Sequence, residues 1–301
     1  MDRLEAMTIL VAAVDAGSLS AASRQLHIPL AKVSRRVSDL EEHLGMRLLL
    51  RGTRKLVLTD AGHDYVASCR RILEEIAQAE RTASGEYRAP QGELIISVPT
   101  MLGRIHVVPV VVEFLRTYSD IRVRLQLTDR NVNLLEEHVD LALRFGELPD
   151  SSMIATRVAL LRQVLCASPA YVKVRGAPTK PEDLVSHDCV AYEGFWTGSY
   201  WAFGTNTIPQ AIRVSSRLVV DSSEAAIIAA TAGAGIARAF SYQVDDLVDA
   251  GSLVTLLAAY EPAPMPVNLI YPSQRQVPLK LRAFLDFSVP RLRERLGYKS
   301  P

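Results

Sequence analysis

The hydrophobic period of this chain changes near residues 84–92. Before that segment, apolar residues recur at spacings of three and four, which is typical of amphipathic helices. After it, short apolar runs alternate with helical patterns. The segment itself, SGEYRAPQG, contains Gly and Pro and indicates a hinge. With 301 residues the chain is long enough for two or three domains, and the hinge divides it into a helical part and an α/β part.

The first sixty residues predict three helices followed by a small basic hairpin. Gly17 and Gly45 each end a helical pattern, and Pro29 suits the first turn of a helix, where its missing N–H costs nothing. This order is typical of a winged helix-turn-helix. We expect helices over 4–14, 21–26 and 29–44, and short strands over 48–50 and 56–58 joined by the basic turn 51–55.

A longer helical pattern follows, capped by Thr59 or Asp60. Its apolar and small residues are spaced 4, 3, 4, 3, 4, which forms a heptad seam on an otherwise charged helix. Because a lone helix cannot bury such a seam, we expect dimerisation through 60–84, with packing on the N-terminal domain as the alternative. The seam consists of Tyr65, Cys69, Ile72, Ile76, Ala79 and Ala83.

The remaining residues predict α/β sheets with helices on both faces. About 210 residues suffice for two lobes with a ligand cleft between them. We expect strands over 93–98, 121–127, 141–145, 158–167, 236–239 and 267–271, and helices over 104–118, 133–138, 223–233, 242–248 and 278–296.

Charge is unevenly distributed although the whole chain carries only +1. Between Arg24 and Lys55 there are eight Lys or Arg against three Asp or Glu, a local excess of five positive charges. A basic stretch within a neutral chain is expected of a module that binds phosphate, although a solvated basic face has the same composition.

Other sequence signals predict a cytoplasmic location and indicate neither an enzyme nor a membrane protein. The three cysteines are widely spaced and indicate free thiols in a reducing compartment. The apolar run 7–14 is short and follows two acidic residues, and the run 225–237 is too short to span a bilayer. No metal spacing, nucleophile elbow or complete dinucleotide fingerprint is present. We therefore expect no catalytic residue, no metal and no cofactor.

The chain resembles the LysR-type transcriptional regulators over its whole length. Matches at fixed spacing are strongest from Met1 to Gly62, and include GSLSAA, VSRRV, LE, LG, RLL and LT followed by AG. The segments DLALRFG and AGAGIA match the family's second domain. Within the family, the paired arginines of the third helix and the segment GTRKLVLT most resemble the branch that contains CrgA.

This resemblance implies an α/β fold class with three parts. They are an N-terminal winged helix-turn-helix (1–59), a long dimerisation linker helix (60–86) and a two-lobed, periplasmic-binding-protein-like effector-binding domain (87–301). Lobe I is expected at about 92–162 and 267–301, and lobe II at about 163–266. The family commonly assembles as tetramers of paired dimers, with sensor lobes meeting edge to edge.

One departure from the family lies at the start of the recognition helix. The family usually carries a Ser-Gln pair there, and this chain has Pro29 and Leu30. A glutamine that could read adenine is therefore missing, while Leu30 could still touch a thymine methyl.

The predicted DNA contacts lie on the recognition helix and the wing. A helix in the major groove reads bases with its N-terminal side chains and holds phosphates with the rest. Val33, Val37 and Leu40 are expected in the core. The predicted DNA-binding residues are Pro29, Leu30, Lys32, Ser34, Arg35 and Arg36 near bases, and Arg51, Arg54 and Lys55 on the backbone or minor groove.

The predicted effector contacts follow the carboxyl ends of strands, where α/β folds bind ligands. Thr100, Thr128, Phe145 and Asp221 occupy such places, and the resemblance puts all four at the border of the family's effector cleft. Residues there are also ordinary caps and turn formers, so both interpretations stay open.

An aromatic cluster supplies two further candidates, Glu193 and Trp196, beside Tyr200 and Trp201. It could line the cleft or fill a lobe core, with the core slightly favoured. Arg144 could pair with a ligand carboxylate, although a structural ion pair is commoner.

The leading hypothesis is a regulator that binds a pseudo-palindromic operator in double-stranded DNA under control of a small-molecule effector. The alternatives are a binding or catalytic module that carries a DNA-binding domain, and a constitutive DNA-bending protein with an inert sensor.

Overall fold

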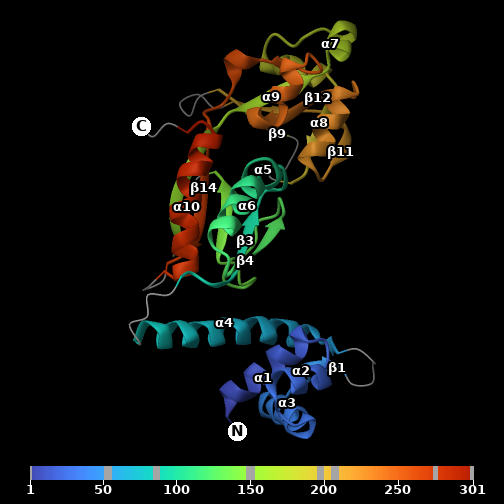
Figure 1. Ribbon diagram of the computed structural model, residues 1–301. Helices are drawn as coiled ribbons and strands as arrows, with labels where there is room; N and C mark the ends of the chain where they lie inside the picture. The colour runs from blue at the N-terminus through green and yellow to red at the C-terminus, as the bar shows by residue number, and fades with distance from the viewer. Residues whose placement is uncertain are drawn as a thin grey trace. The chain divides into compact units, whose positions relative to one another are not determined.

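The computed structural model describes residues 2–50, 56–83, 89–146, 153–194, 200–204, 210–273 and 277–298 (Figure 1). The chain divides into two compact units, Met1–Ala89 and Pro90–Pro301. Each unit has its own hydrophobic core.

The first unit holds three short helices, a two-stranded hairpin and one long helix. Ser18 caps the second helix through its hydroxyl, which accepts from Ala21 N at 3.1 Å, so this helix begins two residues earlier than expected. Gly45 adopts a left-handed conformation and ends the third. The elements are α1 (Arg3–Asp15), α2 (Leu19–Leu26), α3 (Leu30–Leu44), β1 (Leu49–Leu50), β2 (Val57–Leu58) and α4 (Asp60–Ala83).

Helix α4 packs its first turns on its own unit. Val66 and Cys69 are buried, and Tyr65 packs against the cluster formed by α1, α3 and β1. The alternative of packing on the N-terminal domain therefore holds for the start of the predicted seam. Ile72 and Ile76, farther along the same helix, are only half-buried.

Glu41 joins α3 to the hairpin and is one of the few buried charged residues of the first unit. Its Oε1 accepts from the backbone N–H groups of Leu48 and Leu49, at 2.8 and 2.9 Å. Its Oε2 pairs with Arg47 at 3.2 Å. One carboxylate thus satisfies two buried backbone donors and sets where the first strand begins.

The first lobe of the second unit is built on a five-stranded sheet in the order β4-β3-β5-β14-β6. Strands β3, β4 and β5 are parallel, and β14 returns antiparallel beside β5. In Figure 1, α10 lies along this sheet beside β14, and α6 lies beside β3 and β4. The elements are β3 (Gly92–Val98), α5 (Thr100–Leu102), η1 (Gly103–Val107), α6 (Val108–Thr117), β4 (Ile121–Leu127), β5 (Leu141–Phe145), β6 (Met153–Leu161), β14 (Met265–Pro272) and α10 (Leu279–Arg295).

The second lobe is built on a five-stranded sheet in the order β11-β8-β12-β7-β13 and carries a separate hairpin, β9 with β10. Trp201 and Phe203 of this hairpin are buried in the lobe core, so the interpretation of Trp201 as core is confirmed. The elements are β7 (Gln163–Ala167), α7 (Pro169–Arg175), η2 (Pro181–Ser186), β8 (Cys189–Tyr192), β9 (Tyr200–Phe203), β10 (Gln210–Arg213), β11 (Ser216–Val220), α8 (Ser223–Thr231), β12 (Ile236–Phe240), α9 (Ser241–Asp249), β13 (Val254–Leu256) and η3 (Ala258–Tyr260).

Three expectations for this unit were wrong. The segment 133–138 is a hydrogen-bonded turn, in which His138 takes a positive φ of 52° that stops helix propagation. The apolar run 158–167 is two strands in different sheets, broken at Arg162. The helix expected over 104–118 begins at Thr100 and passes through a π-helical stretch, η1, before α6.

Within the described part of the chain, no single helix is both long and apolar enough to cross a membrane. Only α1 and α2 taken together, a pair bent by 117°, meet that test by length and composition.

The role of Glu41 can be tested by replacing it with alanine. Glu41→Ala leaves two buried N–H groups without their acceptor, and we expect the first unit to lose about 2–4 kcal/mol of stability. Amide hydrogen exchange at Leu48 and Leu49 should accelerate, whereas Glu41→Gln, which keeps one acceptor oxygen, should lose less. The exposed neighbour Glu42→Ala is the control, and equal exchange in Glu41→Ala and Glu42→Ala would contradict this role.

Candidate nucleic-acid interface and effector cleft

Helix α3 presents one buried face and one exposed face. Val33, Val37 and Leu40 are buried in the unit's core, which confirms the sequence prediction for them. On the opposite face, all but one of the predicted base-contacting residues are exposed; Arg36 is half-buried. The exposed ones are Pro29, Leu30, Lys32, Ser34 and Arg35. Arg51, Arg54 and Lys55 of the predicted wing lie outside the described residues.

The basic residues of α3 differ in their partners. Glu5 of α1 pairs with Lys32 at 2.7 Å and with Arg36 at 2.9 Å. Arg36 also lies 3.8 Å from Asp39. Arg35 is exposed and forms no ion pair with any residue that the structure describes. The hydrogen bond from Lys32 helps to hold the pKa of Glu5 below its usual value, so Glu5 is ionised at neutral pH.

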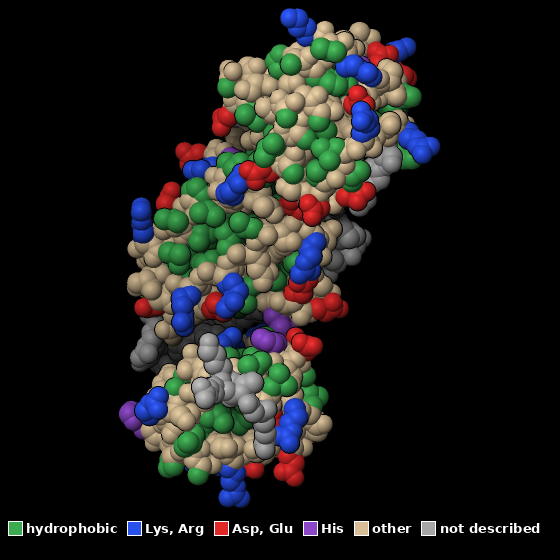
Figure 2. Space-filling view, turned by 90° about the vertical axis from the view of Figure 1, so that its right-hand side faces the viewer, with side chains coloured by type: hydrophobic (Ala, Val, Ile, Leu, Met, Phe, Trp, Pro, Cys, Tyr) green, Lys and Arg blue, Asp and Glu red, His purple; other side chains and the backbone are tan. Residues whose placement is uncertain are grey.

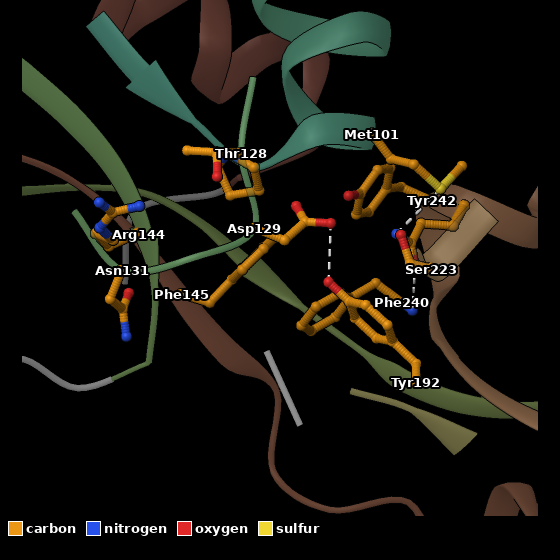
Figure 3. A pocket seen from close by; sticks show the side chains of 12 residues that line it. Met101, Thr128, Asp129, Asn131, Arg144, Phe145, Tyr192, Ser223, Phe240 and Tyr242 are labelled. Atoms are coloured by element: carbon orange, nitrogen blue, oxygen red, sulfur yellow. Dashed lines mark hydrogen bonds between the residues drawn. The ribbon is translucent and has the colours of Figure 1, made fainter. Parts of the chain in front are cut away.

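A cleft opens between the two lobes of the second unit, with about 440 Å³ of space that includes part of the open solvent (Figure 3). It lies where β3, β4 and β5 of the first lobe end and where α8 and α9 of the second lobe begin. Lining residues from the first lobe are Pro99, Met101, Thr128, Asp129, Asn131, Arg144 and Phe145; those from the second are Tyr192, Ser223, Phe240, Tyr242 and Gln243.

Asp129 joins the two lobes at this cleft. Its Oδ1 accepts from the Thr100 N–H at 2.8 Å, within the first lobe. Its Oδ2 accepts from the Tyr192 hydroxyl at 2.8 Å, and Tyr192 ends a strand of the second lobe. Figure 3 shows Asp129 pointing toward Tyr192 and away from Arg144 and Asn131. The Asp129 carboxylate therefore accepts a backbone N–H of the first lobe and the Tyr192 hydroxyl of the second lobe at the same time, and so links the two lobes.

Arg144 is a buried cation in the wall of the cleft, with a side chain only 8% exposed. Its one hydrogen bond is to the Val132 carbonyl at 3.4 Å, and no described carboxylate forms an ion pair with it. Burial lowers the pKa of its guanidinium, because the lost hydration outweighs the attraction of the Glu137 carboxylate, which is itself paired with Arg130. Most of its N–H donors are left for another acceptor.

Aromatic rings form the apolar part of the wall. Phe145 stacks on Phe240 across the lobes, with ring centroids 4.6 Å apart, and Phe240 stacks on Tyr242 at 6.2 Å. Burial raises the pKa of the Tyr242 phenol, so it stays protonated. Gln243 contacts Ser223 at 3.3 Å and accepts from the Phe240 N–H at 2.8 Å. A planar apolar group bound between the lobes would meet ring faces on this side.

Two of the six predicted effector residues line the cleft, Thr128 and Phe145. Thr100 contributes its N–H to Asp129 instead of lining the cleft. Glu193 and Asp221 are exposed and lie outside the lining, while Trp196 lies outside the described residues.

Several lining residues that were not predicted lie one or two positions away from predicted ones. Asp129 follows Thr128, Tyr192 precedes Glu193, and Ser223 follows Asp221 by two. These strand ends therefore lie within two residues of the cleft lining. Tyr242 and Gln243, at the start of α9, were missed although a helix was expected there.

Within the described ranges, no three His, Cys, Asp or Glu side chains lie close enough together to hold a metal ion. The three cysteines are buried, and burial raises the pKa of Cys69 to about 11 and that of Cys166 and Cys189 to about 12. Their thiols are therefore protonated and weakly nucleophilic at neutral pH.

Comparison with known proteins identifies both units. Residues 4–63 match the family described as bacterial regulatory helix-turn-helix protein, lysR family, and residues 88–293 match the LysR substrate binding domain. The chain belongs to the LysR family of transcription regulators. It binds DNA and carries an effector-binding domain, and the members of this family are regulators, not enzymes.

Individual LysR relatives resemble the chain over nearly its full length. The HTH-type transcriptional regulator CrgA of Neisseria meningitidis is 35% identical, with 96% of each chain covered. An HTH-type transcriptional repressor of Pseudomonas aeruginosa is 36% identical over 95% of this chain and 91% of its own. The resemblance to the CrgA branch is thus confirmed.

Solved structures show the same fold. The crystallographic chain of CrgA matches with a TM-score of 0.61, at 35% identity, over 96% of this chain and 98% of its own. The full-length virulence activator AphB of Vibrio cholerae matches with a TM-score of 0.61, at 28% identity, over 95% and 98%. The prediction of a helix-turn-helix joined to a two-lobed α/β effector domain is confirmed.

Proposed function

We propose that this LysR regulator reads a pseudo-palindromic operator with α3 and the wing, and that a small carboxylate bound against Arg144 modulates this binding. The observation that carries the effector half is the buried guanidinium of Arg144, which lines the inter-lobe cleft and forms no ion pair with a described carboxylate.

The DNA half rests on the exposed face of α3. Leu30, Ser34 and Arg35 lie within its first two turns, where a helix in the major groove contacts base edges. Arg35 is the strongest candidate for a base contact because its guanidinium is exposed and is not engaged in an ion pair with a described residue. Leu30, which is 45% exposed, suits an apolar contact with a thymine methyl.

Replacing Arg35 tests the DNA interface. In gel-shift assays on the DNA upstream of the protein's own gene, over a salt series, Arg35→Ala should weaken binding by roughly 5- to 100-fold. Arg116→Ala, which removes an exposed charge from the other unit, is the control. If wild type binds no fragment more tightly than competitor DNA, or if Arg35→Ala binds as wild type does, this interface is wrong.

The effector half follows from the chemistry of the cleft. A carboxylate matches the planar fork of a guanidinium, and a charge-assisted bond to a buried cation is stronger than a neutral one. Asn131 and Thr128 line the same cleft as Arg144 and can bond to further polar groups, while the stacked rings of Phe145 and Phe240 suit an apolar body. A small acid with a flat apolar part fits both halves of the cleft.

A thermal-shift screen of small mono- and dicarboxylates against the full chain tests this site. The acid that stabilises wild type should bind Arg144→Gln roughly 10- to 100-fold more weakly, while DNA binding without the acid is retained. Arg124→Gln is the matched control, because Arg124 is exposed, already paired with Glu93 and outside the cleft lining. Stabilisation only by neutral or cationic compounds, or equal loss in both variants, would overturn the assignment.

LysR regulators form oligomers, and we propose that this chain forms tetramers through two surfaces. The first is the half-buried pair Ile72 and Ile76 on α4, which continues the predicted seam beyond the residues packed on the first unit. The second is the edge of the effector unit, where Val112 of α6 is 44% exposed and Ile228 of α8 is 63% exposed. Figure 2 shows hydrophobic side chains gathered in patches on the effector unit, which supports burial of this kind.

Sedimentation velocity separates the two surfaces. Ile76→Glu and Ile228→Glu should each reduce the tetramer to dimers, and the double variant should be a monomer, because each places a charge in one apolar contact. Circular dichroism checks that each variant is folded. A wild-type monomer, or a tetramer in all variants, would contradict the proposal.

The proposed function also places the protein in the cytoplasm, where its DNA lies.

A further inference from the structure

The first turn of α1 brings a carboxylate against the recognition helix. Asp2 caps α1 by accepting from the N–H groups of Leu4 and Glu5, at 3.0 and 3.3 Å, which fixes the backbone of this turn. From that position Glu5 reaches Lys32 at 2.7 Å and Arg36 at 2.9 Å. Its side chain is 26% exposed, so the carboxylate remains at the surface of the unit.

This single carboxylate divides the cations of α3 into two classes. Lys32 and Arg36 lie four residues apart, on one side of the helix, and both face Glu5. Arg35 is offset by about 100° from Arg36 around the helix axis and has no ion pair with a described residue. All three belong to the face proposed to contact DNA.

A carboxylate and a DNA phosphate compete for the same donors. Each Lys or Arg that neutralises a phosphate releases counter-ions, which supplies most of the affinity for DNA of any sequence. A cation already paired with Glu5 contributes less to that term, because the ion pair must open or be shared. Contacts to base edges do not depend on counter-ion release, so pairing with Glu5 weakens sequence-specific binding less than non-specific binding.

We infer that Glu5 acts as an internal phosphate mimic that withholds Lys32 and Arg36 from non-specific DNA and so sets the balance between affinity and specificity. The inference rests on the proposed DNA interface of α3 and adds a residue outside that helix. Its role is electrostatic, and it requires no contact between Glu5 and a base.

Glu5→Gln tests the inference on the full chain with a duplex of random sequence, by fluorescence anisotropy over a salt series. Removing the charge should raise affinity by roughly 2- to 30-fold, since two exposed ion pairs no longer compete. It should also steepen the dependence of log K on log salt by about 0.9 for each cation released. Glu42→Gln, an exposed acid on α3 with the same change in net charge, is the matched control.

A double-mutant comparison separates pairing from net charge. Glu5→Gln should have little effect in a Lys32→Gln/Arg36→Gln background, because the cations that it would release are absent. If Glu5→Gln and Glu42→Gln raise affinity and the salt slope equally, the effect is one of net charge and the inference is wrong.

A second set of variants leaves α1 intact, in case Glu5→Gln lowers the melting temperature. Arg36→Gln should cost less affinity for random DNA than Arg35→Gln does, because only Arg35 is unpaired among described residues. Equal losses would overturn the inference while preserving the interface. No loss from Arg35→Gln would instead overturn the proposed interface of α3 itself.

Discussion

The lobes of the effector unit are held together by few polar contacts, and the cleft depends on them. The chain leaves the first sheet at Arg162 and returns to it after Glu261, and these two residues form a bidentate ion pair with both distances at 2.9 Å. At the cleft, the Asp129 carboxylate bonds to Tyr192 of the other lobe. Arg104 and Glu224 form a further exposed pair between the lobes, at 2.7 Å. The stacked rings of Phe145 and Phe240 add an apolar contact between the lobes, so a ligand bound at the cleft meets both kinds of contact that fix the relative placement of the sheets.

The hydrophobic pattern predicted where helices and strands lie better than it predicted which of them pack together. The strands at 121–127 and 141–145 were predicted to the residue, because alternation and a short apolar run are local signals. The run 158–167 predicts a single strand, because apolar residues indicate that a segment is buried but do not indicate which sheet buries it. The seam on α4 was ambiguous for the same reason, and its start is buried within its own unit.

Several residues that line the cleft lie one or two positions away from the residues that the sequence indicates, and this offset has a physical origin. A strand end tells where a loop begins, but the turn that follows decides which side chain faces the cleft. Thr128 marks the end of β4, yet Asp129 provides the contact between lobes because the loop turns it toward Tyr192. The pairing of Glu5 with α3 had no sequence signal, because it depends on how α1 packs across α3, which begins 25 residues after Glu5.

In both units an internal carboxylate takes up polar groups at the candidate site. Glu5 pairs with two cations of α3, and Asp129 accepts from a backbone N–H and a tyrosine hydroxyl at the cleft. In each unit one arginine has no ion pair with a described carboxylate, Arg35 on α3 and Arg144 in the cleft. In the interface proposed for α3, the internal carboxylate lowers the affinity for any polyanion, whereas the exposed arginine favours a partner with the matching geometry. That proposal exchanges binding strength for discrimination, which suits a regulator that selects one operator among many DNA sequences.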